Sequence, residues 1–235
     1  SRLLYGARVS LTVALLSAAI AMVVGVALGL IGGYFRGLSE ILTLRFVDVV
    51  LSFPPILLAL LVVTLFGPGV VTLTACLSIL FVPGFARVTY GEVLSVRKLD
   101  YVEATRALGA RPPQIILGTV LPNVSGPILV QVSLTVASAV LIESGLSFLG
   151  LGVVPPAPSW GLMIREARGT MAFSALALVW PCLALVITVL VFNALCDGLR
   201  DVFDPKRNAQ RRAAPPPVPF TPADPDPEAA LTVHD

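Results

Sequence analysis

Five apolar segments, each about as long as a membrane-crossing helix, constrain this chain more than any other feature. A helix needs about 20 apolar residues to cross the hydrocarbon core of a bilayer. The five segments are residues 11–31, 46–66, 70–88, 124–151 and 172–195. Their hydropathy is continuous rather than alternating, which excludes an outer-membrane barrel. We therefore predict an all-α fold, a polytopic transmembrane helix bundle embedded in a lipid bilayer.

Composition agrees with a chain that lipid covers. Of 235 residues, 56% are hydrophobic and 13% are charged, which is too little charge to cover a water-soluble globule of this size. The net charge of +2 argues against nucleic acid as a partner. The three cysteines lie in apolar runs and the single histidine lies near the C-terminus, so we expect neither a disulfide framework nor a metal site.

The basic residues are divided unequally between the two sides of the predicted membrane. If successive spans alternate in direction, 12 of the 16 Lys and Arg residues lie on the side of residues 89–123 and the C-terminus. Cytoplasmic loops are enriched in these residues, so we expect that side to be cytoplasmic and Ser1 to be external. An external start with five spans leads us to expect a sixth, N-terminal span that is missing here.

A polar stretch interrupts the apolar sequence between the third and fourth spans. Asp100 can cap a helix while Glu103, three residues later, reaches back to the cap, which is the pattern of a capping box. We predict a short helix over 101–108, ended by Gly109, because glycine adopts the left-handed conformation found after helices.

Three prolines predict a second helix in the same stretch. Pro112 and Pro113 suit a first helical turn, where a missing N–H group costs nothing, and Pro122 is expected to end this helix. Two short, amphipathic helices between membrane spans would form a stiff structure at the membrane surface. We expect residues 89–123 to be a cytoplasmic loop of this kind.

The spacing of the loop resembles the coupling loop of bacterial ABC importer permeases. That motif reads Glu-Ala-Ala, three residues, Gly, nine residues, Ile, one residue, Leu-Pro. The matching residues here are Glu103, Ala104, Gly109, Leu121 and Pro122, while Thr105 and Thr119 depart from the motif. Residues 144–152 also resemble the Leu-Ser-Phe-Leu-Gly-Leu-Gly signature of the peptide and nickel branch, so the chain is similar to its C-type subunit.

The resemblance implies a type I ABC importer-like permease of six spans in the bacterial inner membrane. The implied partners are a homologous permease that forms a heterodimer with this chain, two ATPase subunits and an extracytoplasmic substrate-binding protein. The sequence has no Gly-x-x-x-x-Gly-Lys-Ser/Thr phosphate loop. We therefore expect no cofactor in this chain, with ATP and Mg held by the ATPase chains.

The resemblance also gives the cytoplasmic helix a role in coupling to an ATPase. Ala104 and Ala107 would allow close approach, and Leu108 would be an apolar anchor. The expected coupling residues are Asp100, Tyr101, Glu103, Ala104, Ala107, Leu108, Gly109, Arg111, Leu121 and Pro122. For Glu103 alone, a helix-capping role without an ATPase contact is the alternative.

Three polar residues in the predicted spans are candidates for the pathway or the bundle interior. Glu143 and Ser144 lie in the fourth span, where a carboxyl group must face protein or water. A structural carboxyl is favoured there over a contact with substrate. For Asp48, an ion pair with Arg45, three residues earlier, is favoured over a role in transport.

The segment that follows the fourth span resembles the Pro-Ser-Trp-Gly element of the same family. We expect Ser159, Trp160 and Gly161 to lie on an external surface that meets the binding protein. Beyond residues 1–205, which form the predicted permease domain, residues 206–235 are rich in Pro and acidic residues. We expect them to be a disordered cytoplasmic tail.

Prolines and glycines also predict how the spans bend and pack. Pro54 and Pro55 remove backbone hydrogen bonds and should kink the second span. The short Gly67-Pro68-Gly69 connection makes the second and third spans an antiparallel hairpin. In the first span, four glycines, at positions 25, 29, 32 and 33, predict close helix packing.

Other functions stay open at this point. Within the importer family, nickel or another small solute is the nearest alternative to di- or oligopeptides. An ion-coupled secondary transporter would need paired ionisable residues near the middle of the membrane, whereas Glu143 and Asp48 lie near opposite ends of their spans. A membrane-embedded enzyme is disfavoured, because the sequence lacks a nucleophile arrangement and has one histidine.

Overall fold

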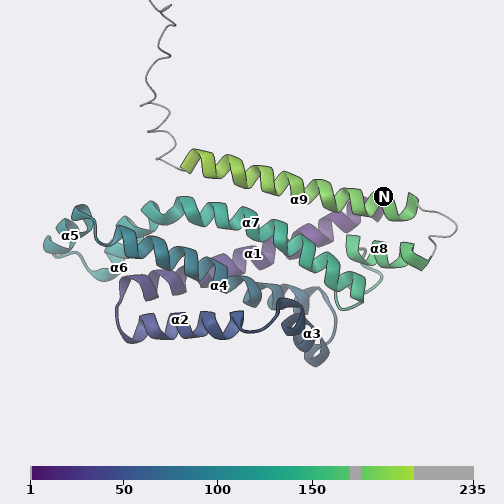
Figure 1. The fold of residues 1–235 in the computed structure, drawn as a ribbon, viewed down its shortest axis with the longest axis horizontal. Coiled ribbons are helices and arrows are strands. Elements are labelled where there is room, and N and C mark those ends of the chain that lie inside the picture. Colours follow the sequence, from purple (N-terminus) through teal and green to yellow (C-terminus); the bar gives the residue numbers. More distant parts are fainter. Residues whose placement is uncertain (1, 170–175, 204–235) are drawn as a thin grey trace, which may run out of the picture. The chain divides into compact units, whose positions relative to one another are not determined.

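The computed structural model describes residues 2–169 and 176–203, and these residues form helices with no strand among them (Figure 1). The elements are α1 (Arg2–Tyr34), α2 (Leu38–Leu51), α3 (Pro55–Phe66), α4 (Val70–Val96), α5 (Asp100–Ala107), α6 (Pro112–Ile115), a π-helical turn η1 (Ile116–Val120), α7 (Leu121–Leu149), α8 (Trp160–Gly169) and α9 (Leu176–Phe203). The all-α prediction is confirmed. The predicted tail, 206–235, lies outside the described residues.

Within the described part of the chain, four helical stretches are long and apolar enough to cross a membrane. They are α1, α4, the continuous run from α6 to α7 (Pro112–Leu149), and α9 up to Val202. The fifth predicted span, 46–66, corresponds to α2 and α3, which would make one broken span if counted together. The predicted span count is thus approximately right, although most of these helices extend beyond the predicted apolar segments.

The break between α2 and α3 lies at the two prolines. Pro54 precedes α3 and Pro55 is its first residue, and the axes of the two helices differ by 85°. A proline inside a helix cannot donate the backbone hydrogen bond and clashes with the preceding turn. The predicted kink is confirmed, and it is sharp enough to end one helix and begin another.

Close packing of α1 against α4 forms the centre of the bundle. A Cβ atom added to Gly25 would lie 2.6 Å from Cβ of Phe85, and one added to Gly29 would lie 2.6 Å from Cβ of Thr89. A Cβ on Gly33 would likewise lie 2.8 Å from Cβ of Val93. The glycines therefore let the two backbones approach, as small residues four apart do in membrane helices.

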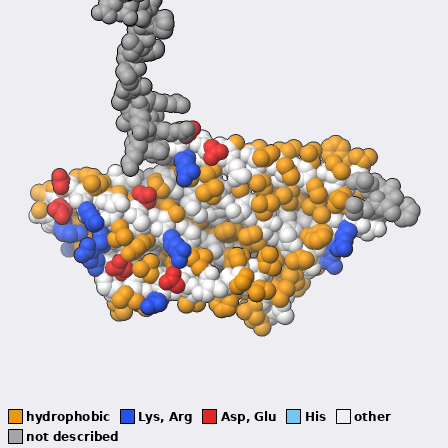
Figure 2. All heavy atoms as spheres, viewed as in Figure 1, with side chains coloured by type: hydrophobic (Ala, Val, Ile, Leu, Met, Phe, Trp, Pro, Cys, Tyr) orange, Lys and Arg blue, Asp and Glu red, His pale blue; other side chains and the backbone are white. Residues whose placement is uncertain are grey.

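The two ends of these helices carry different short elements. Figure 1 shows α5 and α6 at one end and α8 at the other, with α9 running beside α7. Most side chains of α9 are not covered by the other helices. Only 6% of its most apolar 18-residue stretch is buried. Figure 2 shows a largely hydrophobic surface with several Lys and Arg side chains gathered at the α5 end.

Candidate coupling site

The short helix α5 begins one residue earlier than predicted and is not held by a capping box. Leu99 is its N-cap residue, and no side-chain hydrogen bond caps this helix. The capping box predicted for Asp100 and Glu103 is therefore wrong, because Asp100 already lies in the first helical turn. Both carboxylates remain in that turn, where a negative charge interacts favourably with the positive end of the helix dipole.

The turn between α5 and α6 agrees with the predicted use of glycine and proline. Gly109 has a φ of 84°, a left-handed conformation that an L side chain adopts only at a cost. Pro112 begins α6 and Pro113 follows it. The backbone N–H of Arg111 donates a hydrogen bond of 2.9 Å to Oε1 of Gln114, which satisfies a free donor at the start of α6.

The helix that begins at Pro112 does not end at Pro122, so this prediction is wrong. It continues through η1 into α7, and Pro122 lies in the first turn of α7. A π-helical turn inserts a residue into the helical ladder, so the N–H that proline lacks is accommodated there. Leu121 and Pro122 consequently belong to the base of a membrane-crossing helix rather than to a separate loop.

Apart from one buried residue, α5 presents its side chains to solvent. Tyr101 is 42% exposed and Leu108, its C-cap residue, is 89% exposed. Asp100, Glu103, Ala104, Ala107, Gly109 and Arg111 are also exposed. Large apolar side chains with this exposure, next to small alanines, form a surface that can accommodate a partner protein.

Val102 is the exception and attaches α5 to the bundle. It is fully buried, in a core cluster that includes Val93 and Val96 of α4 and Ile115 of α6. Sequence reasoning missed Val102, although it is the one β-branched aliphatic residue in the polar helix α5 and could have been found that way. Val102 therefore attaches α5 directly to the end of α4 and to α6.

Two arginines connect this region to the end of α1. The guanidinium of Arg106 lies 5.6 Å from the ring centre of Tyr34 and donates a 3.4 Å hydrogen bond to its hydroxyl. Arg97 donates a 2.7 Å hydrogen bond to the carbonyl of Gly33. Gly33 lies at the C-terminal end of α1, where a cation interacts favourably with the helix dipole. Sequence reasoning did not identify Tyr34, because Arg106 lies 72 residues away from it in the sequence.

Asp48 forms an ion pair with a different arginine from the one predicted. Its Oδ1 lies 3.1 Å from a guanidinium nitrogen of Arg87 on α4, and both side chains are 56% exposed. The predicted pair with Arg45 is wrong, because packing of α2 against α4 brings Arg87 closer. An exposed pair of this kind contributes little to stability.

Glu143 and Ser144 lie in the interior at the opposite end of the bundle. Glu143 is fully buried, and Ser144 and Ser147 donate hydrogen bonds to its carboxyl oxygens at 3.3 and 2.8 Å. This placement agrees with a structural carboxyl in the bundle. Glu143 is therefore remote from α5 along the length of α7.

The residues predicted to lie on the external surface are buried inside the protein. Ser159 is 0% exposed, Trp160 is 3% exposed and Gly161 is buried. Their expected exposure is wrong, because they pack against α1 and α7. On α8 the exposed side chains are instead Arg165, Glu166 and Arg168.

Residues 25–209 match the family described as "Binding-protein-dependent transport system inner membrane component". The match covers most of the chain, including α5 and the close α1–α4 packing. The chain belongs to this family. The predicted recognition from the spacing around Glu103 and Gly109 is thereby confirmed.

Several curated members of this family resemble the chain over most of its length. The glutathione transport system permease protein GsiD of Pectobacterium atrosepticum is 40% identical over 206 residues, which is 88% of this chain and 68% of GsiD. The di/tripeptide transport system permease protein DppC of Pseudomonas aeruginosa is 38% identical over the same shares. These relatives place the chain in the peptide branch of ABC permeases.

Solved structures agree on the fold of this family member. The inward-facing methionine ABC transporter MetNI has a TM-score of 0.71 at 20% identity, covering 86% of this chain and 96% of that chain. An amino acid ABC transporter solved with histidines has a TM-score of 0.63 at 14% identity, covering 83% and 91%. At these identities the likeness concerns the fold, and it confirms the predicted ABC importer permease architecture.

Proposed function

We propose that this chain is the membrane-spanning subunit of an ATP-driven importer of di- or oligopeptides. The observation that carries the proposal is the exposed helix α5, at the position of the coupling motif, in a member of the binding-protein-dependent transport family. The names of its relatives, which transport glutathione and di- or tripeptides, support a peptide as the substrate. The pathway is formed together with a homologous permease.

Coupling proceeds through contacts of α5 with an ATPase subunit. ATP and Mg bind to the ATPase chains, whose closure carries α5 with them. Leu108 and Tyr101 provide the apolar contact area, and the fully buried Val102 passes the movement to the ends of α4 and α6. Because α1 and α4 pack without space between their backbones, they move together and open the pathway to the other side.

The α5 end is cytoplasmic in this proposal. Arg97, Lys98, Arg106 and Arg111 all lie at this end, and cytoplasmic segments are enriched in basic residues. The α8 end then faces the substrate-binding protein. Arg165, Glu166 and Arg168, which are exposed on α8, replace Ser159, Trp160 and Gly161 as the residues that contact it.

The test is ATP hydrolysis by the complete complex with its binding protein. Leu108→Asp, Gly109→Pro and Glu103→Lys are each expected to abolish substrate-stimulated hydrolysis, because they alter the contact surface or the turn that supports it. The matched control is Val202→Asp, which places the same charge on an apolar side chain that is 71% exposed on α9. Wild-type stimulation in all three variants would contradict the coupling role.

The substrate is determined by ligand binding to the partner binding protein. Calorimetric titration with glutathione, dipeptides, longer peptides and Ni²⁺ separates the peptide from the metal alternative. Saturable binding of a peptide supports the proposal. Binding of Ni²⁺ alone would leave the coupling mechanism intact and overturn the peptide assignment.

A further inference from the structure

Glu143 is a fully buried carboxyl group that the coupling mechanism does not use. It lies on α7, and four serine hydroxyls surround it: Ser144 and Ser147 donate to it, and Ser10 and Ser159 are also hydrogen-bonded to it. Ser10 belongs to α1 and Ser159 directly precedes α8. We call these five residues the Glu143 cluster. It connects three elements that are distant in the sequence.

Three of the four hydroxyls also accept a hydrogen bond from the backbone. Ser10 accepts from the N–H of Trp160 at 3.4 Å, Ser147 from Val153 at 3.2 Å, and Ser159 from Leu162 at 3.2 Å. Each hydroxyl thus has its hydrogen available for the carboxyl oxygens of Glu143. The cluster therefore links the backbone of residues 153–162 to α1 and α7 through a single acceptor.

The backbone at Gly152 and Gly161 also lies very close to α7. It cannot move away from α7 without losing these packing contacts. A Cβ atom on Gly161 would lie 2.1 Å from the carbonyl oxygen of Ser144, and one on Gly152 would lie 2.0 Å from Oγ of Ser147. On the α1 side, the indole of Trp160 packs over Gly6 and donates a 3.2 Å hydrogen bond to the carbonyl of Leu3.

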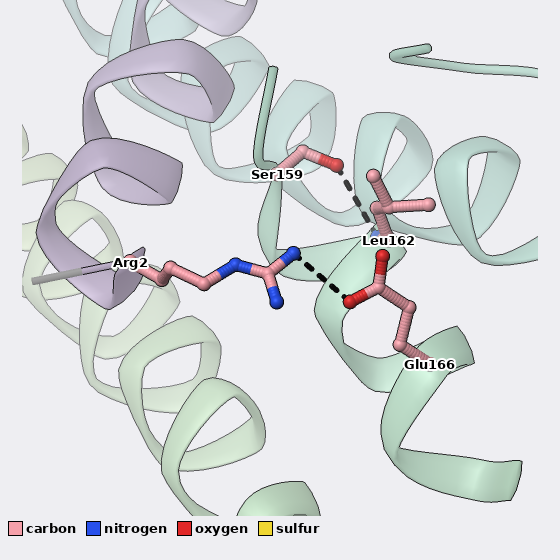
Figure 3. Close-up of polar contacts among 4 residues, drawn as sticks. All are labelled: Arg2, Ser159, Leu162 and Glu166. Carbon is pink, nitrogen blue, oxygen red and sulfur yellow. Dashed lines mark hydrogen bonds and ion pairs between the residues drawn. The ribbon is translucent and has the colours of Figure 1, made fainter. Parts of the chain in front are cut away.

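An exposed ion pair also joins α1 to α8. Figure 3 shows Arg2 of α1 reaching Glu166 of α8, with a nitrogen-to-oxygen distance of 3.0 Å, beside the hydrogen bond between Ser159 and Leu162. The contacts that hold α8 thus consist of the buried Glu143 cluster and an exposed ion pair. An exposed pair is worth little, whereas buried hydrogen bonds to a carboxyl are costly to lose.

We propose that Glu143 is a positioning residue that holds α8 against α1 and α7, so that these three helices respond to the binding protein as one body. The second half rests on the proposed function, in which the binding protein meets α8. Glu143 acts here as the acceptor that orders four hydroxyl groups. An amide at this position would present an N–H₂ group to hydroxyl hydrogens and would break that order.

Trp160 provides a direct measure of how α8 is held. The chain has two tryptophans, so Trp180→Phe leaves Trp160, which is 3% exposed, as the only indole. In that background, Glu143→Gln and Glu143→Ala are both expected to raise the acrylamide quenching of Trp160 severalfold. Glu92→Gln, on α4, is the matched control and is expected to leave the quenching unchanged.

Function is measured in the same variants assembled with the homologous permease, the ATPases and the binding protein. Both Glu143 variants are expected to lose the binding-protein-stimulated part of ATP hydrolysis and to keep the basal rate. A role in filling space alone would let Glu143→Gln behave as wild type in both measurements, and that result overturns the inference. Shielded Trp160 with lost stimulation would overturn it as well.

A smaller change covers the case in which Glu143 variants do not assemble. Ser10→Ala removes one donor and leaves the N–H of Trp160 without its acceptor, so increased quenching of Trp160 is expected, and unchanged quenching overturns the inference. Absence of stimulation in the wild-type complex would instead overturn the proposed function. The quenching of Trp160 then still decides whether Glu143 holds α8.

Discussion

The α5 end and the α8 end of the bundle are attached in opposite ways. At the α5 end, one buried side chain, Val102, and one ring contact, between Arg106 and Tyr34, join a mostly exposed helix to the core. At the α8 end, Ser159 and Trp160 are both buried, and Trp160 donates hydrogen bonds to Ser10 and Leu3 of α1.

The difference matches what each end has to do in the proposed transport cycle. A helix that docks into an ATPase must expose its apolar and small side chains, so few of them remain to attach it to its own chain. A helix that passes a signal from an external protein can bury most of its contacts. Substitutions at the two ends should therefore show whether attachment by one buried residue differs in strength from attachment by a cluster.

The largest effect is expected at the single buried attachment of α5. Val102→Asp places a charge without a partner in an apolar core, which costs several kcal/mol, and should detach α5. Limited proteolysis between residues 97 and 111 in detergent is the measurement, and cleavage should become rapid.

Leu108→Asp is the matched control for that variant. Leu108 is 89% exposed, so the same charge there should leave proteolysis unchanged while removing ATPase binding. Equal protease resistance in the Val102 and Leu108 variants would show that Val102 is not the main attachment of α5.

At the α8 end, the corresponding variant is Gly161→Ala. Its Cβ would overlap the carbonyl oxygen of Ser144, and overpacking of this kind costs about 1–3 kcal/mol. We expect a lower midpoint of thermal unfolding together with greater acrylamide quenching of Trp160. Gly145→Ala, for which no atom lies within 4 Å of the added Cβ, should leave Trp160 shielded, and a similar loss in both would contradict the close approach.

Sequence patterns predicted the α5 end better than the α8 end, for a physical reason. The turn at Gly109 and the helix start at Pro112 follow from local backbone rules, and both were predicted correctly. The capping role of Asp100 failed, because a shift of one residue in the helix start removes it. A motif spacing of 20 residues could nevertheless be recognised without any knowledge of packing.

Pairings between distant helices could not be predicted in this way. Asp48 meets Arg87, 39 residues away, rather than Arg45, and Ser10 meets Glu143 and Trp160, which lie 133 and 150 residues later. Such contacts depend on how whole helices pack. The same holds for the particular atoms of α4 that the glycines of α1 approach. For the same reason Trp160, an aromatic residue near a predicted membrane interface, was expected on the surface but is buried by α1.

A smaller effect is expected from the ring contact at the α5 end. Arg106→Met removes the cation from the face of Tyr34 and should cost about 0.5–1 kcal/mol. Tyr34→Phe keeps the ring and removes only the long 3.4 Å hydrogen bond, so its cost should be smaller. Chemical denaturation in mixed micelles measures both, and an equal cost for the two would assign the contact to the hydroxyl rather than to the ring.

The smallest effect is expected from the ion pair at the surface of the α8 end. Arg2 and Glu166 are 65% and 45% exposed, and exposed pairs contribute about 0.2–1 kcal/mol. A double-mutant cycle with Arg2→Gln and Glu166→Gln should therefore give a coupling free energy below about 1 kcal/mol that decreases with added salt. A larger, salt-insensitive coupling would mean that the surface pair, and not the Glu143 cluster, holds α8, and the contrast between the two ends would then lose its basis.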